Sequence, residues 1–130
     1  MTRSLKALTI LVALILVEFP AQPAAAVEWP VATPTSVDLY GASLGFSLEP
    51  GDIVTVRTPS GLVCGTCEVS TAGFYGLVHV YGDDPTTPER DGALPGERLE
   101  LDVNGEPVRP AGAEPVWTRD GDRQRVNVAR

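Results

Sequence analysis

The sequence predicts an all-β domain, a single antiparallel β-sandwich of about seven strands over residues 36–130. Short runs in which apolar and polar residues alternate recur along the chain, and "DIVTVRT" and "RLELDV" are the clearest. Gly, Pro and Asn residues, which favour turns, separate these runs. No segment after residue 26 has the 3.6-residue period of an amphipathic helix. Several short strands divided by turns are typical of a β-sandwich.

The strands follow, in order, from apolar periodicity and from the turns between them. Alternation begins at residue 37 and is regular over 53–57 and 98–103. The turns "TPSG" at 58–61 and "NG" at 104–105 each predict a hairpin, because their residues supply the backbone angles of tight turns. A last hairpin is predicted around "RDGD" at 119–122. The side chains expected in the core are Val37, Leu39, Val54, Val56, Leu62, Val69, Leu77, Leu99, Leu101, Val103, Val126 and Val128.

Residues 1–26 precede this domain and have the order of a secretory signal peptide. Two cations, Arg3 and Lys6, come before the apolar run 7–17, and Ala24-x-Ala26 then provides a small-residue cleavage site. The apolar run is shorter than the roughly 20 residues that a membrane-spanning helix needs. We therefore expect cleavage after Ala26, export to the extracellular space or periplasm, no membrane insertion afterwards, and a lead-in over 27–35.

The charge balance argues against a nucleic-acid partner. The whole chain carries −7, and residues 1–26 carry +1 from Arg3, Lys6 and Glu18, so the mature chain carries −7 − 1 = −8. A strongly acidic domain repels phosphate backbones. Arginines do gather near the end of the chain, but acids lie among them, which indicates a solvated hairpin of mixed charge. These arginines are Arg119, Arg123, Arg125 and Arg130.

The acidic loop, "VYGDDPTTPERDGALPGE" at 80–97, is the first candidate site. Asp83 and Asp84 leave one strand, and Glu89 and Asp91 follow a bend stiffened by prolines. Calcium takes several oxygen ligands at about 2.3–2.6 Å, so these four acids form a candidate calcium site. The alternative is a solvated loop, or one whose acids pair with Arg90 and Arg98. No other cofactor is expected.

Cys64 and Cys67 form a C-x-x-C motif without the helix that a redox enzyme places after it. In an exported protein a disulfide is the natural expectation. Residues three apart in a regular strand point to opposite faces, so this bond needs a turn or bulge between them. The alternative is two unlinked small residues in the core.

Aromatic and nucleophilic residues suggest two further sites. Trp117 and Tyr81 form a candidate platform for stacking a sugar, and the alternative is that Trp117 fills the end of the core. Ser43 lies in "GASLG", a match to the G-x-S-x-G pattern, but no helix follows it as a hydrolase requires. His79, on a predicted strand, has no evident catalytic partner in sequence. We therefore expect no enzyme.

A family resemblance covers about residues 35–128. The stretch "TPSGLVCGTCEVSTAGFYG" resembles the central hairpin of carboxypeptidase-regulatory-like (prealbumin-like) β-sandwich modules, and "NGEP" and "PVWT" follow in a similar order. The resemblance implies a non-catalytic module of bacterial secreted or surface proteins with no assigned activity. Its expected partner is an extracellular protein or glycan surface. The other two functions considered are a small carbohydrate-binding module and a small secreted hydrolase.

Overall fold

A computed structural model describes residues 28–130, so the predicted signal peptide and its cleavage site lie outside the described residues. The described chain is all-β, as predicted, with eight strands. No helix in this part of the chain is long and apolar enough to cross a membrane. The strands are β1 Ser36–Leu44, β2 Ile53–Arg57, β3 Val63–Glu68, β4 Phe74–Tyr81, β5 Glu100–Val103, β6 Glu106–Pro110, β7 Arg123–Arg125 and β8 Val128–Ala129.

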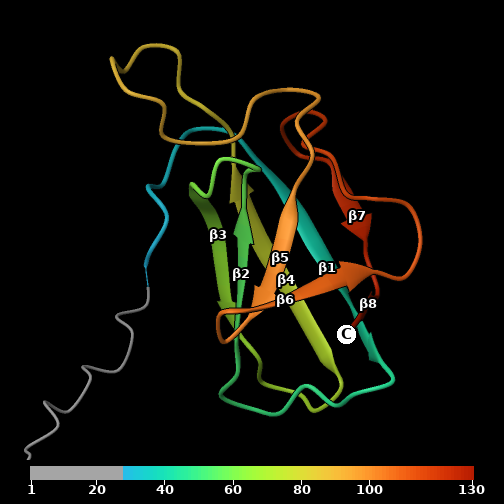
Figure 1. The fold of residues 1–130 in the computed structure, drawn as a ribbon. Coiled ribbons are helices and arrows are strands. Elements are labelled where there is room, and N and C mark those ends of the chain that lie inside the picture. Colours follow the sequence, from blue (N-terminus) through green and yellow to red (C-terminus); the bar gives the residue numbers. More distant parts are fainter. Residues whose placement is uncertain (1–27) are drawn as a thin grey trace, which may run out of the picture.

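The strands form one mixed sheet in the order β3-β2-β5-β6-β8-β1-β4, and β7 also pairs with β1. The sheet curves until its two end strands approach each other (Figure 1). A Cβ added to Gly65 on β3 would lie 2.8 Å from the carbonyl oxygen of His79 on β4. The fold is therefore a nearly closed barrel, and the prediction of an antiparallel sandwich is corrected at this point.

Two predicted hairpins form as expected and supply four neighbouring strands at one end of the sheet order, β3-β2-β5-β6. Gly61, with φ of +94°, closes the turn between β2 and β3. Asn104 and Gly105 have φ of +51° and +86°, the two positive angles of the type I′ turn that joins β5 to β6. β2 pairs with β5, placing Val54 opposite Val103 and so joining the two hairpins.

The predicted hairpin around residues 119–122 is wrong. β7 runs parallel to β1, pairing Asp38 with Arg123 and Tyr40 with Arg125. The segment 115–118 contributes only an isolated bridge, between Val116 and Arg98. Because a proline begins this segment, its backbone lacks one donor that a paired strand needs.

Ten of the twelve side chains expected in the core are buried, and two are not. Leu62 is half-buried in the β2–β3 turn, and Leu77 is 43% exposed. A β-bulge on β4 explains Leu77: Leu39 pairs with Val78 but Gly41 pairs with Tyr75, so β4 contains one extra residue. The bulge turns Tyr75 inward and leaves Leu77 outside. The buried hydrophobic residues absent from the expected list are Leu48, Val63, Cys64, Tyr75, Val78, Val80, Ala93 and Trp117.

Candidate interaction surface

The acidic loop is organised by its own carboxylates, which accept hydrogen bonds from the loop. Asp83 Oδ1 accepts from the Asp91 N–H at 3.0 Å, and Asp91 Oδ1 accepts from the Asp84 N–H at 2.9 Å. Asp84 Oδ1 accepts from both the N–H and the hydroxyl of Thr86. The hydrogen bond from the Asp84 N–H, the largest cause, together with that from Thr87, holds the pKa of Asp91 below its ordinary value.

The two arginines expected to neutralise this loop pair with acids other than the four calcium candidates. Arg90 forms an ion pair with Glu97, and its Nε donates to the Gly92 carbonyl. Burial raises the pKa of Glu97, but hydrogen bonds from Arg90 and from the Leu94 N–H outweigh burial and leave that pKa lowered. Arg98 pairs with acids outside the loop.

No group of three or more His, Cys, Asp or Glu side chains within residues 28–130 converges as a metal ion would require. Glu89 takes part in the loop through its backbone carbonyl, which accepts from Thr87 Oγ1. The four acids of the calcium hypothesis are thus placed in one loop (the gold segment at the top of Figure 1). In three of them, Asp83, Asp84 and Asp91, the carboxylate oxygens already accept hydrogen bonds from N–H or O–H groups of the loop.

Trp117 packs against Val80 and Gly82, where the acidic loop begins, and is only 5% exposed. Its Nε1 donates to the Val80 carbonyl at 2.9 Å, and a Cβ added to Gly82 would lie 2.4 Å from its Cζ2. Tyr81, between Val80 and Gly82 in sequence, is half-buried. This placement matches the alternative considered for Trp117, a side chain that fills the end of the core, and it leaves no free ring face for a sugar.

Cys64 and Cys67 are free thiols on β3. Cys64 is fully buried, its Sγ contacts the Val56 carbonyl at 3.4 Å, and burial raises its pKa to about 12. Burial also raises the pKa of Cys67. A thiol with a raised pKa carries little thiolate at neutral pH and is a weak nucleophile.

The other nucleophile candidates hold the fold or lie on its surface. Ser43 Oγ accepts from the Leu48 N–H at 3.2 Å and donates to the Gly73 carbonyl at 3.4 Å. His79 pairs across β1 and β4 with Asp38, with 2.5 Å between Nδ1 and Oδ1. No third partner completes a catalytic arrangement around either residue among those that the structure describes.

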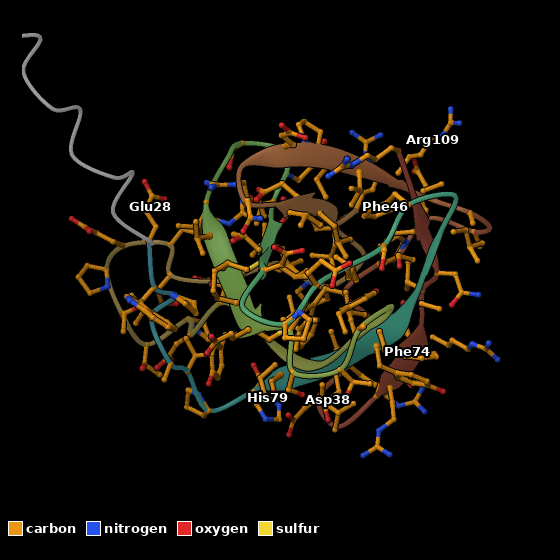
Figure 2. All side chains as sticks on the ribbon, turned by 90° about the horizontal axis from the view of Figure 1, so that it is seen from below. Glu28, Asp38, Phe46, Phe74, His79 and Arg109 are labelled. Atoms are coloured by element: carbon orange, nitrogen blue, oxygen red, sulfur yellow. The ribbon has the colours of Figure 1, made fainter. Side chains whose placement is uncertain are left out.

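The outer face of β4, β1 and β7 carries large apolar side chains that are exposed to solvent. Tyr40 is 38% exposed, Phe74 59% and Leu77 43%. Tyr40 and Phe74 point outward because Leu39 and Tyr75, their neighbours in sequence, point into the core. Figure 2 shows Phe74, Asp38 and His79 along one margin of the molecule, away from Arg109.

Gly76 allows β4 to approach β1 closely at Tyr40. A Cβ at Gly76 would be 2.5 Å from the Tyr40 Cβ, and Gly76 has φ of +121°, which side chains rarely permit. The extra residue of the β4 bulge lies opposite Tyr40. A glycine in a strand interior often marks such a bulge, so Gly76 is the sequence signal that could have corrected the prediction of a buried Leu77.

Two arginines border the apolar side chains on β7. Pairing in register places Arg125 beside Tyr40 and Arg123 beside Asp38, on the same outer face. Both are exposed, and neither forms an ion pair with any residue in 28–130. We call the set Tyr40, Phe74, Leu77, Arg123 and Arg125 the aromatic face. The sequence pattern had assigned its two arginines to a solvated hairpin.

A hollow of about 420 Å³ adjoins the aromatic face next to Arg125. Its other lining residues include Leu44, at the end of β1, and the small residues Ala111, Gly112 and Ala113. Leu44 is 45% exposed, so the hollow offers an apolar wall that solvent reaches. The hollow and the aromatic face are continuous through Arg125.

A larger hollow, of about 550 Å³, lies on β5 and β6, but most of its charged side chains are already paired. Arg57 Nε donates to Asp102 at 2.8 Å, and this hydrogen bond raises the pKa of Arg57. Arg98 pairs with Glu100 at 3.3 Å and with Glu114 at 3.9 Å. Paired charges attract a ligand less than unpaired ones, so the aromatic face is the stronger candidate.

The chain matches no protein-family model, no curated protein and no solved structure. The structure defines the class of protein only by its fold: within residues 28–130 the chain is an all-β domain whose eight strands form a nearly closed barrel.

Proposed function

We propose that this chain is a secreted, non-catalytic interaction module that binds an extracellular partner through the aromatic face. The observation that carries the proposal is the coincidence, on one side of β4, β1 and β7, of exposed aromatic side chains with two arginines that form no ion pair within residues 28–130. Tyr, Phe and Arg are enriched at protein interfaces and over-represented among the residues that dominate binding energy.

A partner that covers exposed aromatic rings removes apolar surface from water and so gains binding free energy. Burial contributes about 25 cal/mol per Å² of apolar surface, and the parts of Tyr40 and Phe74 that remain exposed, 38% and 59%, are available to a partner. A soluble domain that keeps Tyr40, Phe74 and Leu77 beside one another therefore has a ready source of binding energy. The resemblance to carboxypeptidase-regulatory-like modules supports the same class of function.

The non-catalytic part of the proposal has its own support. Candidate nucleophiles and acids serve the fold: Ser43 and Asp84 accept backbone hydrogen bonds, and Cys64 is buried. Calcium is not needed for the proposed binding, because the aromatic face contains one carboxylate neighbour, Asp38, which already contacts His79.

The test compares labelled chains spanning 28–130 for binding to the envelope of the cell that secretes the protein. The double substitution Tyr40→Ser with Phe74→Ser should weaken binding at least about 30-fold, the equivalent of roughly 2 kcal/mol. Trp29→Ser is the matched control, because Trp29 is 72% exposed but lies in the lead-in. Equal binding by wild type and the double variant, with melting unchanged, would overturn the proposal.

A further inference from the structure

Resting on the proposed function, we infer that the occupant of the aromatic face is an extended acidic segment of another protein, with carboxylates at alternate positions and an aliphatic side chain two positions beyond them.

Charge complementarity is the first argument. The mature chain has a net charge of −8, yet Arg123 and Arg125 are exposed with no ion pair among the described residues. Elsewhere in the domain, four arginines do have acidic partners. Guanidinium groups bind carboxylates bidentately and lose less hydration energy than ammonium groups do. An acidic segment satisfies them, whereas a basic one meets repulsion.

Spacing is the second argument. Arg123 and Arg125 are two residues apart on one strand, and strands rise about 3.3 Å per residue, so their Cα atoms are about 6.6 Å apart. An extended peptide repeats its side-chain direction at the same interval. Acids at positions i and i+2 of a bound segment therefore meet both arginines at once, whereas adjacent acids point to opposite sides.

The hollow supplies the third argument. It begins at Arg125 and continues along the chain to Val126 and Asn127, with Leu44 as an apolar wall. A segment whose acids contact Arg123 and then Arg125 therefore reaches the hollow with its next inward side chain, at i+4. An aliphatic side chain fits the small residues there, and the rest of the segment lies against Tyr40.

Nuclear magnetic resonance titration of the ¹⁵N-labelled chain 28–130 tests this inference, because it detects weak binding and locates it. The probe is the peptide GESESLSG. Three control peptides carry GQSQSLSG (no charge), GEESSLSG (acids adjacent) and GESESSSG (no aliphatic side chain). We expect saturable shifts confined to β1, β4, β7 and the 111–113 loop. Each control peptide should bind at least about fivefold more weakly, the effect of about 1 kcal/mol.

Two charge reversals make a matched pair of variants. Arg125→Glu should abolish the shifts, whereas Arg109→Glu should leave them intact, because Arg109 is also free of ion pairs in the described range but lies on β6. Raising the salt from 20 mM to 1 M should weaken binding, since charges are screened beyond about 3 Å at 1 M.

Several outcomes overturn the inference. Equal binding of GESESLSG and GEESSLSG removes the spacing argument, and equal binding of GQSQSLSG removes the charge argument. Tighter binding of oligogalacturonate, with the same dependence on Arg125, assigns the face to an acidic glycan. Concentration-dependent dimers that shift the same resonances assign it to a second copy. Absence of peptide binding, with envelope binding still dependent on Tyr40 and Phe74, refutes this inference and leaves the proposed function standing.

Discussion

Replacement of Trp117 separates a core role from a sugar-stacking role. Trp117 is 5% exposed, and its Nε1 donates to the Val80 carbonyl at 2.9 Å. Trp117→Phe keeps an aromatic ring but removes the donor. Val80 also pairs with Val37 in the β1–β4 ladder, so the variant loses one hydrogen bond, at about 0.5–1.5 kcal/mol, and the lost ring volume adds about 1 kcal/mol. We therefore expect the free energy of unfolding to fall by about 1.5–2.5 kcal/mol.

That loss corresponds to a large fall in melting temperature. For a domain of this size, each kcal/mol shifts the midpoint by about 4–8 °C, so Trp117→Phe should melt at least about 6 °C below wild type. Trp117→Ala should cost about 3–5 kcal/mol for the cavity alone, a large part of the 5–15 kcal/mol that stabilises an ordinary domain.

The assay is thermal and urea unfolding followed by circular dichroism. Trp29→Phe is the control, because Trp29 is 72% exposed and should change the midpoint little. A stacking tryptophan on the surface contributes to ligand binding and not to stability. Equal melting of Trp117→Phe and wild type would therefore refute the core placement of Trp117 and restore the sugar-binding hypothesis.

Four further predictions follow from single contacts. Gly82→Ala should lower the free energy of unfolding by about 1–3 kcal/mol, the cost of overpacking, because the new Cβ would lie 2.4 Å from the Trp117 ring. Urea unfolding measures this loss, and Gly112→Ala is the control because nothing lies within 4 Å of a Cβ at Gly112. Asp91→Asn should lower the melting midpoint at pH 7. The pKa of Asp91 is lowered in the folded state from its ordinary 3.8, so the stability that its carboxylate contributes is complete above pH 3.8 and is lost as the pH falls through the folded pKa. The melting midpoints of wild type and variant should therefore converge in acid. Cys64 should resist a thiol reagent at pH 8 in the folded protein and react in urea, since burial raises its pKa to about 12; rapid labelling of the folded protein contradicts this. Millimolar calcium should leave the melting midpoints of wild type and of the double variant Asp83→Asn with Asp84→Asn unchanged relative to a chelator, because these carboxylates already accept hydrogen bonds. A calcium-dependent rise of several degrees in wild type alone would show a site.

Local patterns were enough to predict the class of fold and most of the core. Alternation over β2 and β5 places Val54 and Val103 inside because a strand turns every second side chain to the same face. The turn "NG" predicts the β5–β6 hairpin, since Asn and Gly tolerate the positive φ values that the turn requires. Both effects act within a few residues, so the sequence carries them directly.

The tertiary structure decided which strands pair and, through this, what lies on the surface. Alternation specifies a face of a strand but not its partner, so the parallel pairing of β7 with β1 and the near closure between β3 and β4 were not predicted. The same limit applies to the acidic loop, whose carboxylates find backbone N–H groups that only its folded path brings near.

The aromatic face shows both contributions in one place. The sequence by itself determined that a strand contains Phe74 and that arginines gather near the end of the chain. Only the tertiary structure decided that one extra residue on β4 turns Leu77 outward, and that β7 lies beside β1 with Arg125 next to Tyr40. The physical reason is that a bulge and a parallel pair depend on contacts between residues about 40 to 85 positions apart, whose closure no local propensity encodes.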